Sequence, residues 1–256
     1  DQATVTAFVP DILLTMPTVG EFRQVTSIFV NCQPTPDRAQ EDTFFHDLFL
    51  LLARYGGYLC RVGRIGGKDS GMTLLIFFGA PLSYEQDISR ALGFLLDLWD
   101  VAPMPLRAGV TTNRAYAGFV GSPRSEEYTC HSIHVNLAAR HMIAAGWEEI
   151  WFDQATADRA QADFIVETLG ARPFKGFAEK RTVYRLLGRR EAVAETFYQG
   201  EMVGRAAELA QLHEWLQPIR RGRFGGAIYI TGEAGMGKSR LVHEFQQQIE
   251  QQSPGL

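Results

Sequence analysis

The chain has 256 residues, 46% of them hydrophobic, and a formal net charge of −4. This much apolar sequence can form one good core and part of a second, and the negative charge argues against a protein that binds nucleic acid. No apolar run is long enough to span a membrane. The scattered cysteines, Cys32, Cys60 and Cys130, suit a reducing cytoplasm and provide neither a disulfide framework nor a zinc site.

The chain begins at Asp1 and carries no basic-then-apolar leader, so we expect it to be a piece of a longer chain. Residues 1–20 contain two prolines and few charges, which is typical of an extended connector. A polar stretch broken by glycine predicts a linker over 189–203, between a first domain at 21–188 and a second unit at 204–256.

Within 21–188 the residue pattern predicts elements in the order β-α-β-β-α-β, with additions after them. Strand patterns occur at 22–31, 58–64 and 72–78, and helical spacing at 41–55 and 84–100. A hairpin is predicted from 106–112 and 115–120, with its turn at Thr112-Asn113-Arg114. Further elements are predicted at 135–145, 149–152, 154–161, 163–168 and 181–187. This order predicts an α+β, ferredoxin-like sandwich in which helices pack on one face of a mostly antiparallel sheet.

The helix predicted after Ser132 carries the first candidate site. Its apolar stripe consists of Val135, Ala138, Met142 and Ile143. Asn136 and Arg140 are four residues apart and therefore share a different face. An amide beside a guanidinium can stabilise charge that grows on a phosphate in a transition state. Spacing alone, however, favours a solvated arginine and an asparagine near a helix start.

The sequence around this pair resembles the signature of class III adenylyl/guanylyl cyclases. In that signature an Arg…(Asp/Glu)-Tyr-Thr strand leads into a Val-Asn-Leu-Ala-Ala-Arg helix. The matching residues are Arg124, Glu127-Tyr128-Thr129 and Val135-Asn136-Leu137-Ala138-Ala139-Arg140, together with Gly20–Thr26, Phe78-Gly79-Ala80-Pro81 and Gly118–Gly121. The resemblance covers most of 21–188 and is greatest for the second catalytic half of soluble-type cyclases. It implies the α+β cyclase fold.

The resemblance also implies where metals would bind. Class III cyclases hold two metal ions on two aspartates, and the matching positions here carry Asn31 and Met72. Neutral Asn31 is a poor Mg²⁺ ligand because Mg²⁺ sites usually need carboxylate charge. Asp69 could substitute only if its hairpin is lengthened. We therefore expect no metal site in this domain, and Mg²⁺ or Mn²⁺ to arrive through a partner half.

The resemblance further implies roles for the remaining site residues. Asn136 and Arg140 would be the catalytic residues, Lys68 would contact phosphate, and Thr129 would help to read an adenine edge, although Thr129 is also an ordinary strand residue. The expected function is a cyclase half-domain that converts ATP to cyclic AMP and pyrophosphate together with a second cyclase homology domain, upstream in the same longer chain. The alternatives are an inactive pseudo-cyclase that binds nucleotide or a small anion and regulates the attached ATPase, and a purely structural dimerisation module.

A second motif lies in Gly232-Glu233-Ala234-Gly235-Met236-Gly237-Lys238-Ser239, which matches the P-loop pattern G-x-x-x-x-G-K-[ST]. Gly232, Gly235 and Gly237 would let backbone amides cradle phosphates, Lys238 would reach the β/γ-phosphates of ATP, and the Ser239 hydroxyl would bind Mg²⁺. A strand is predicted at 227–231 and a helix from Arg240. The surroundings resemble AAA-type ATPase modules, and we expect a module cut short before its Walker-B strand.

Three histidines, His131, His134 and His141, lie close together in the sequence. A metal cluster is one reading, but no cysteine or carboxylate completes a ligand set.

Overall fold

The computed structural model describes residues 20–35, 37–65, 71–122, 125–190, 202, 204–221, 223, 225–233 and 235–252. The chain divides into two compact units between Glu191 and Ala192, and each is described by itself. Among the described residues, no helix has the length and apolar character needed to cross a membrane.

The first unit opens with the predicted β-α-β-β-α-β order. Its elements are β1 (Glu21–Cys32), α3 (Arg38–Tyr55), β2 (Tyr58–Ile65), β3 (Gly71–Phe78), α4 (Asp87–Val101) and β4 (Leu106–Ser122). Local chemistry fixes α3 at both ends. The Asp37 side chain accepts a hydrogen bond from Ala39 N at 2.9 Å, and Gly56 adopts the left-handed conformation that ends the helix, with φ at 73°.

The remaining elements of this unit are β5 (Ser125–His131), α5 (Ile133–Ala144), β6 (Ile150–Asp153), α6 (Gln154–Ala160), β7 (Phe164–Arg172) and β8 (Arg181–Arg189). The strands form one sheet in the order β2-β3-β1-β4-β6-β8-β7, and β5 pairs with β4 outside this path. Only the β4–β6 pair is parallel among the pairs of described strands. The predicted α+β fold with a mostly antiparallel sheet is confirmed.

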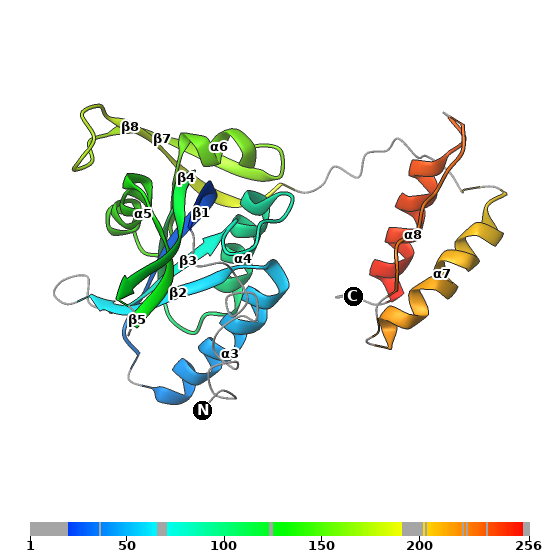
Figure 1. Ribbon diagram of the computed structural model, residues 1–256, viewed down its shortest axis with the longest axis horizontal. Coiled ribbons are helices and arrows are strands. Elements are labelled where there is room, and N and C mark those ends of the chain that lie inside the picture. Colours follow the sequence, from blue (N-terminus) through cyan, green and yellow to red (C-terminus); the bar gives the residue numbers. More distant parts are fainter. Residues whose placement is uncertain are drawn as a thin grey trace. The chain divides into compact units, whose positions relative to one another are not determined.

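The two faces of the sheet are covered differently (Figure 1). Alternate β4 residues such as Ala108 and Val110 face the main core, which α3, α4 and α6 close. The residues between them face α5, as Gly109 shows by its close approach to the α5 backbone. The expectation that helices cover one face is therefore wrong for α5, which lies alone on the other face beside an aromatic cluster around Phe77 and Tyr128.

The predicted hairpin at 106–120 is also wrong, because β4 runs unbroken from Leu106 to Ser122. Its pairing with β1 extends from Leu106 to Ala117 without a register shift, so the ladder overrides the turn tendency of Asn113-Arg114. Asn113 instead donates from Nδ2 to Asp153 Oδ2 at 2.9 Å. Strand β8 likewise extends one residue into the predicted linker, to Arg189, which donates to Asp97 Oδ1 on α4 at 2.6 Å.

The second unit contains α7 (Ala206–Arg220) and α8 (Lys238–Gln252). The prediction of a strand at 227–231 is wrong, since these residues form no strand and pair with none among the described residues. A strand needs a neighbouring strand to satisfy its backbone groups. Helix α8 begins at Lys238, two residues before the predicted start.

Candidate functional site

Helix α5 presents the candidate catalytic residues. The Ser132 side chain caps it by accepting hydrogen bonds from the backbone N–H of His134 and Val135, each at 3.2 Å. This start fixes which residues face the sheet: Val135, Leu137, Ala138, His141 and Met142 are buried. Ile143, expected on the apolar stripe, is instead 50% exposed, and Gly146 lies past the cap residue Ala145.

Gly109 on β4 brings α5 unusually close to the sheet. A Cβ built on Gly109 would lie 2.0 Å from Ala138 O and 2.3 Å from Met142 N, where no side chain fits. This close approach needs glycine and sets the height of α5 above the strand. The face of α5 that carries Asn136 and Arg140 is turned away from this contact, and Asn136 is exposed.

Arg140 is half-buried and held by a backbone carbonyl. Its guanidinium donates a hydrogen bond to Lys175 O in the segment between β7 and β8. Gly176 follows with φ at 84°, and a Cβ built there would lie 3.4 Å from Arg140 Nη1. Asn136 and Arg140 thus lie one helical turn apart on the same face of α5, as expected from their spacing.

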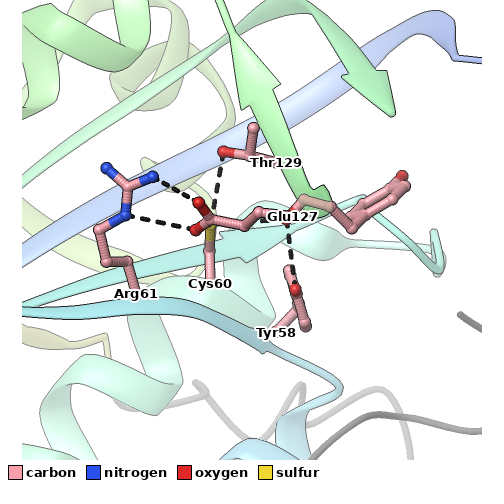
Figure 2. Close-up of polar contacts among 6 residues, drawn as sticks. Tyr58, Cys60, Arg61, Glu127 and Thr129 are labelled. Atoms are coloured by element: carbon pink, nitrogen blue, oxygen red, sulfur yellow. Dashed lines mark hydrogen bonds and ion pairs between the residues drawn. The ribbon is translucent and has the colours of Figure 1, made fainter. Parts of the chain in front are cut away.

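Thr129 lies on the edge strand β5 and is 6% exposed, and its surroundings come from β2 (Figure 2). Cys60 Sγ donates to Thr129 Oγ1 at 3.4 Å, and burial raises the pKa of the Cys60 thiol to about 11. Beside it, the Arg61 guanidinium binds the Glu127 carboxylate at 2.5 Å and lowers the pKa of that carboxyl. Tyr58 donates to Tyr128 O at 3.2 Å. The hydroxyl expected to read a base edge therefore already has a protein partner.

The two positions that match the metal aspartates are adjacent in space and hold no carboxylate. Asn31 is completely buried, and its Nδ2 donates to Met72 O at 3.1 Å. Its Oδ1 accepts from Arg107 Nε at 3.0 Å, while the Arg107 guanidinium also donates to Ile143 O and lies over the Trp147 ring. The positively charged Arg107 guanidinium therefore already contacts the Asn31 amide oxygen, where a metal ion would have to bind. Asn31, Met72 and Arg107 do not fit a divalent metal.

The three histidines are not brought together. His131 is exposed, whereas His141 is completely buried, with Nδ1 3.3 Å from Val110 O and its ring against Phe174. His134 contacts Phe177. No group of three or more histidine, cysteine, aspartate or glutamate side chains within the described part of the chain could hold a metal.

Neither of the two larger cavities that border the sheet in the described part of the chain is lined by Asn136 or Arg140. The larger, about 510 Å³, lies on the α4 side and includes Thr26 and Thr112. The other, about 360 Å³, lies between α5 and β8 and includes His134 and Arg181. The candidate catalytic pair is instead on an open face of the domain.

Lys68 and Asp69 lie outside the described residues, as does Arg124. Sequence reasoning missed three partners of the site: Arg107 at Asn31, Cys60 at Thr129, and the Lys175 carbonyl at Arg140. All three are contacts between distant elements, and only Lys175-Gly176, a lysine followed by glycine in a loop, offered a local signal.

In the second unit, the P-loop glycines adopt conformations that side chains rarely take. Gly235 and Gly237 have φ of 85° and 78°, which turns the loop ahead of the α8 N-terminus. Lys238 Nζ donates to Gly232 O at 2.9 Å and to Glu233 O at 2.7 Å. Ser239 is exposed in the first turn of α8, and Ala234 lies outside the described residues.

The chain is similar to known ATPase and adenylate cyclase sequences. Residues 201–256 match the family model of the AAA ATPase domain. The chain is 27% identical over 250 residues to adenylate cyclase type 10 of Homo sapiens, an alignment that covers 89% of this chain and 15% of that protein. It is 31% identical over 134 residues to an adenylate cyclase of Mycobacterium tuberculosis, covering 49% of this chain and 30% of that protein.

Solved structures agree with the fold. The adenylyl cyclase CyaB from P. aeruginosa superimposes with a TM-score of 0.57 and 18% identity, over 68% of this chain and 98% of that one. The guanylate cyclase domain of RhGC from Catenaria anguillulae, solved in complex with GTP, gives 0.56 and 19%, over 66% and 100%. The chain spans about 15% of the length of the type 10 relatives. It carries an adenylyl/guanylyl cyclase-like domain of the class III fold, followed by a segment that matches the AAA ATPase domain.

Proposed function

We propose that this cyclase-like domain is a half-site: it supplies Asn136 and Arg140 to a second cyclase homology domain that carries the metal aspartates. The pair would convert ATP to cyclic AMP and pyrophosphate. The observation that carries the proposal is the contrast between α5 and β1. On α5, Arg140 is held by a hydrogen bond beside exposed Asn136. On β1, Asn31 is buried and accepts a hydrogen bond from Arg107.

The chemistry assigned to Arg140 follows from charge. As the ribose 3′-oxygen attacks the α-phosphorus and the bond to pyrophosphate breaks, negative charge grows on the phosphoryl oxygens. A guanidinium fixed on that side stabilises the transition state more than the bound substrate. Asn136, one turn earlier on the same face, can donate a hydrogen bond to the same group of atoms.

The partner must bring the metals, because Asn31 and Met72 offer no carboxylate and Arg107 already places a cation at the amide. Lys68, a further candidate for phosphate contact, lies outside the described residues and stays a prediction. The likeness to adenylate cyclases in the curated relatives supports ATP as the substrate.

The test is complementation in trans. A metal-competent class III catalytic domain is made inactive by removing its own asparagine and arginine of this helix, and the present chain is added with ATP and Mn²⁺. We expect cyclic AMP to appear only in the mixture. Arg140→Ala and Asn136→Ala should each lower kcat by ~10²–10³ with little change in KM. Arg140→Lys should not rescue, because an ammonium lacks the planar fork.

Arg38→Ala is the matched control, since it removes an exposed arginine from α3 on the opposite face of the sheet. It should leave the mixture fully active. Nucleotide bound without any product in the mixture would contradict the half-site proposal and favour the alternative below.

A specific observation supports the second candidate, a pseudo-cyclase that binds nucleotide or a small anion and regulates the attached ATPase. The Thr129 hydroxyl is engaged by Cys60, and the Arg61–Glu127 ion pair ties β2 to β5 beside it. A site already satisfied internally gains little from a purine edge. In that case ATP titration would alter turnover by the ATPase of the longer chain, and Arg140→Ala would remove this effect without any cyclic AMP being formed.

For the second unit we propose binding of Mg-ATP at the P-loop. The positive φ angles of Gly235 and Gly237 leave backbone N–H groups able to converge on phosphates. Lys238 would exchange its carbonyl partners for phosphate oxygens, and Ser239 would hold Mg²⁺.

A further inference from the structure

The segment that joins β7 to β8, residues 173–180 and hereafter the β7–β8 loop, contacts α5 through residues 174–177. The Phe174 ring packs edge-on against the buried His141 ring, with centroids 4.9 Å apart. The Phe177 ring contacts His134 at 5.8 Å and has the Arg181 guanidinium over its other side at 4.8 Å. A backbone hydrogen bond from Phe177 N to Phe174 O at 3.2 Å closes the loop between these two anchors.

Arg140 meets the loop between the two aromatic anchors. Its guanidinium donates to the Lys175 carbonyl and lies against Gly176, whose Cβ position is in van der Waals contact with it, 3.4 Å from Nη1 and 3.9 Å from Nη2. The φ of 84° at Gly176 turns the chain directly after the accepting carbonyl. The two aromatic contacts thus fix the carbonyl, and the carbonyl fixes the guanidinium.

We propose that the β7–β8 loop, through the Lys175 carbonyl and Gly176, is the positioning element of Arg140. This inference rests on the half-site function proposed above. A free arginine side chain populates many rotamers, and a transition-state donor is most effective when this freedom is removed in advance. A guanidinium has five N–H donors, so one carbonyl can hold it while other donors serve a phosphoryl group.

Two glycines of this hairpin allow a matched experiment. Gly176 and Gly170 have nearly the same φ, 84° and 85°. An added Cβ at Gly176 meets Arg140, whereas nothing lies within 4 Å of the Cβ position at Gly170. Asparagine tolerates this conformation better than other residues with a Cβ. Gly176→Asn and Gly170→Asn therefore place a side chain on a residue with nearly the same φ, and only at Gly176 does that side chain start in contact with the guanidinium, so that its amide must compete for the same space.

In the complementation assay we expect Gly176→Asn to lower kcat roughly 10- to 100-fold with KM nearly unchanged, because small misplacements of a catalytic group have effects of this size. Gly170→Asn should leave both parameters unchanged. In an Arg140→Ala background, Gly176→Asn should have no additional effect, since the group it displaces is gone. Equal kcat for Gly176→Asn and Gly170→Asn, with Arg140→Ala still impaired, would overturn the positioning role alone.

A second measurement does not depend on activity. Rotation of the Arg140 guanidinium about its Nε–Cζ bond can be followed by NMR in the chain with ¹⁵N-labelled arginine. We expect slow rotation in the wild type and in Gly170→Asn, and faster rotation in Gly176→Asn. Fast rotation in the wild type would overturn the inference. If rotation is slow but Arg140→Ala leaves kcat unchanged, the half-site function fails instead.

Discussion

His141 follows Arg140 in the chain but points into the contact between α5 and β4. It is completely buried, and burial lowers the pKa of its imidazole from 6.5 to about 4. Its Nε2 has no hydrogen-bond partner among the described residues. The folded protein therefore keeps this imidazole neutral at pH values where the unfolded chain would protonate it.

We predict from His141 that stability falls as pH is lowered from 6.5 towards 4. In this window the unfolded state binds more protons than the folded state, so acidification favours unfolding. At about 1.4 kcal/mol per tenfold change in proton affinity, the loss between pH 7 and 5 should be about 2 kcal/mol. Native-state hydrogen exchange of β4 amides in the first unit measures it.

His141→Leu should remove most of this pH dependence and leave the contribution of His134, whose pKa is also lowered by burial. His131→Leu, which removes an exposed histidine just before α5, should keep the full dependence. The carboxyl of Glu127 contributes at lower pH only, because its pKa is lowered from 4.5 by Arg61. An unchanged slope in His141→Leu would show that another group is responsible.

At the scale of elements, the position of α5 depends on Gly109. We predict that Gly109→Ala destabilises the first unit by about 3 kcal/mol or prevents it from folding, since the added methyl would overlap the backbone of α5 at Ala138 and Met142. Backbone cannot move aside as a side-chain end can. Because α5 carries Asn136 and Arg140, activity in complementation should fall together with stability.

The matched control is Gly63→Ala on β2, where the new Cβ would meet only Thr73 Oγ1, at an ordinary 3.7 Å. This variant should unfold at nearly the same urea concentration as the wild type. A mild effect of Gly109→Ala, comparable to Gly63→Ala, would mean that α5 can shift outward on the sheet.

At the scale of the whole molecule, we predict that this chain alone makes almost no cyclic nucleotide. The buried Asn31 amide is already bonded to Met72 O and Arg107, so Mn²⁺ and ATP find no carboxylate pair there. An assay with Mn²⁺, ATP and the isolated chain checks this. Robust turnover would contradict the half-site proposal and bring forward Asp69, which lies outside the described residues.

The two units should bind ATP independently. Lys238→Ala should weaken Mg-ATP binding at the P-loop at least tenfold, because the loop loses its only lysine for the β/γ-phosphates, and calorimetric titration measures the change. Arg223→Ala, which removes an exposed positive charge shortly before the P-loop, should bind as the wild type does. We also expect no ATP hydrolysis by this chain; phosphate release that disappears in Lys238→Ala would overturn that expectation.

Local pattern was sufficient for much of the first unit. The β-α-β-β-α-β order follows from alternation and helical spacing, and the four-residue interval placed Asn136 and Arg140 on one face of α5. The P-loop was equally readable, because its glycines and lysine act within eight consecutive residues. These features depend on neighbours in sequence, and composition and spacing record them directly.

Only the tertiary structure decided which distant residues meet. The ladder with β1 kept β4 unbroken through Asn113-Arg114, and Gly109 let α5 approach the sheet closely on the face opposite α3, α4 and α6. The fold also brings together three hydrogen-bonded pairs: Arg107 with Asn31, Cys60 with Thr129, and Arg140 with the Lys175 carbonyl. Each of these contacts joins elements whose separation in space is set by the packing of the whole sheet. A single sequence records the residue types but not that packing, which is why it indicated the candidate pair Asn136 and Arg140 and not the contacts that hold it.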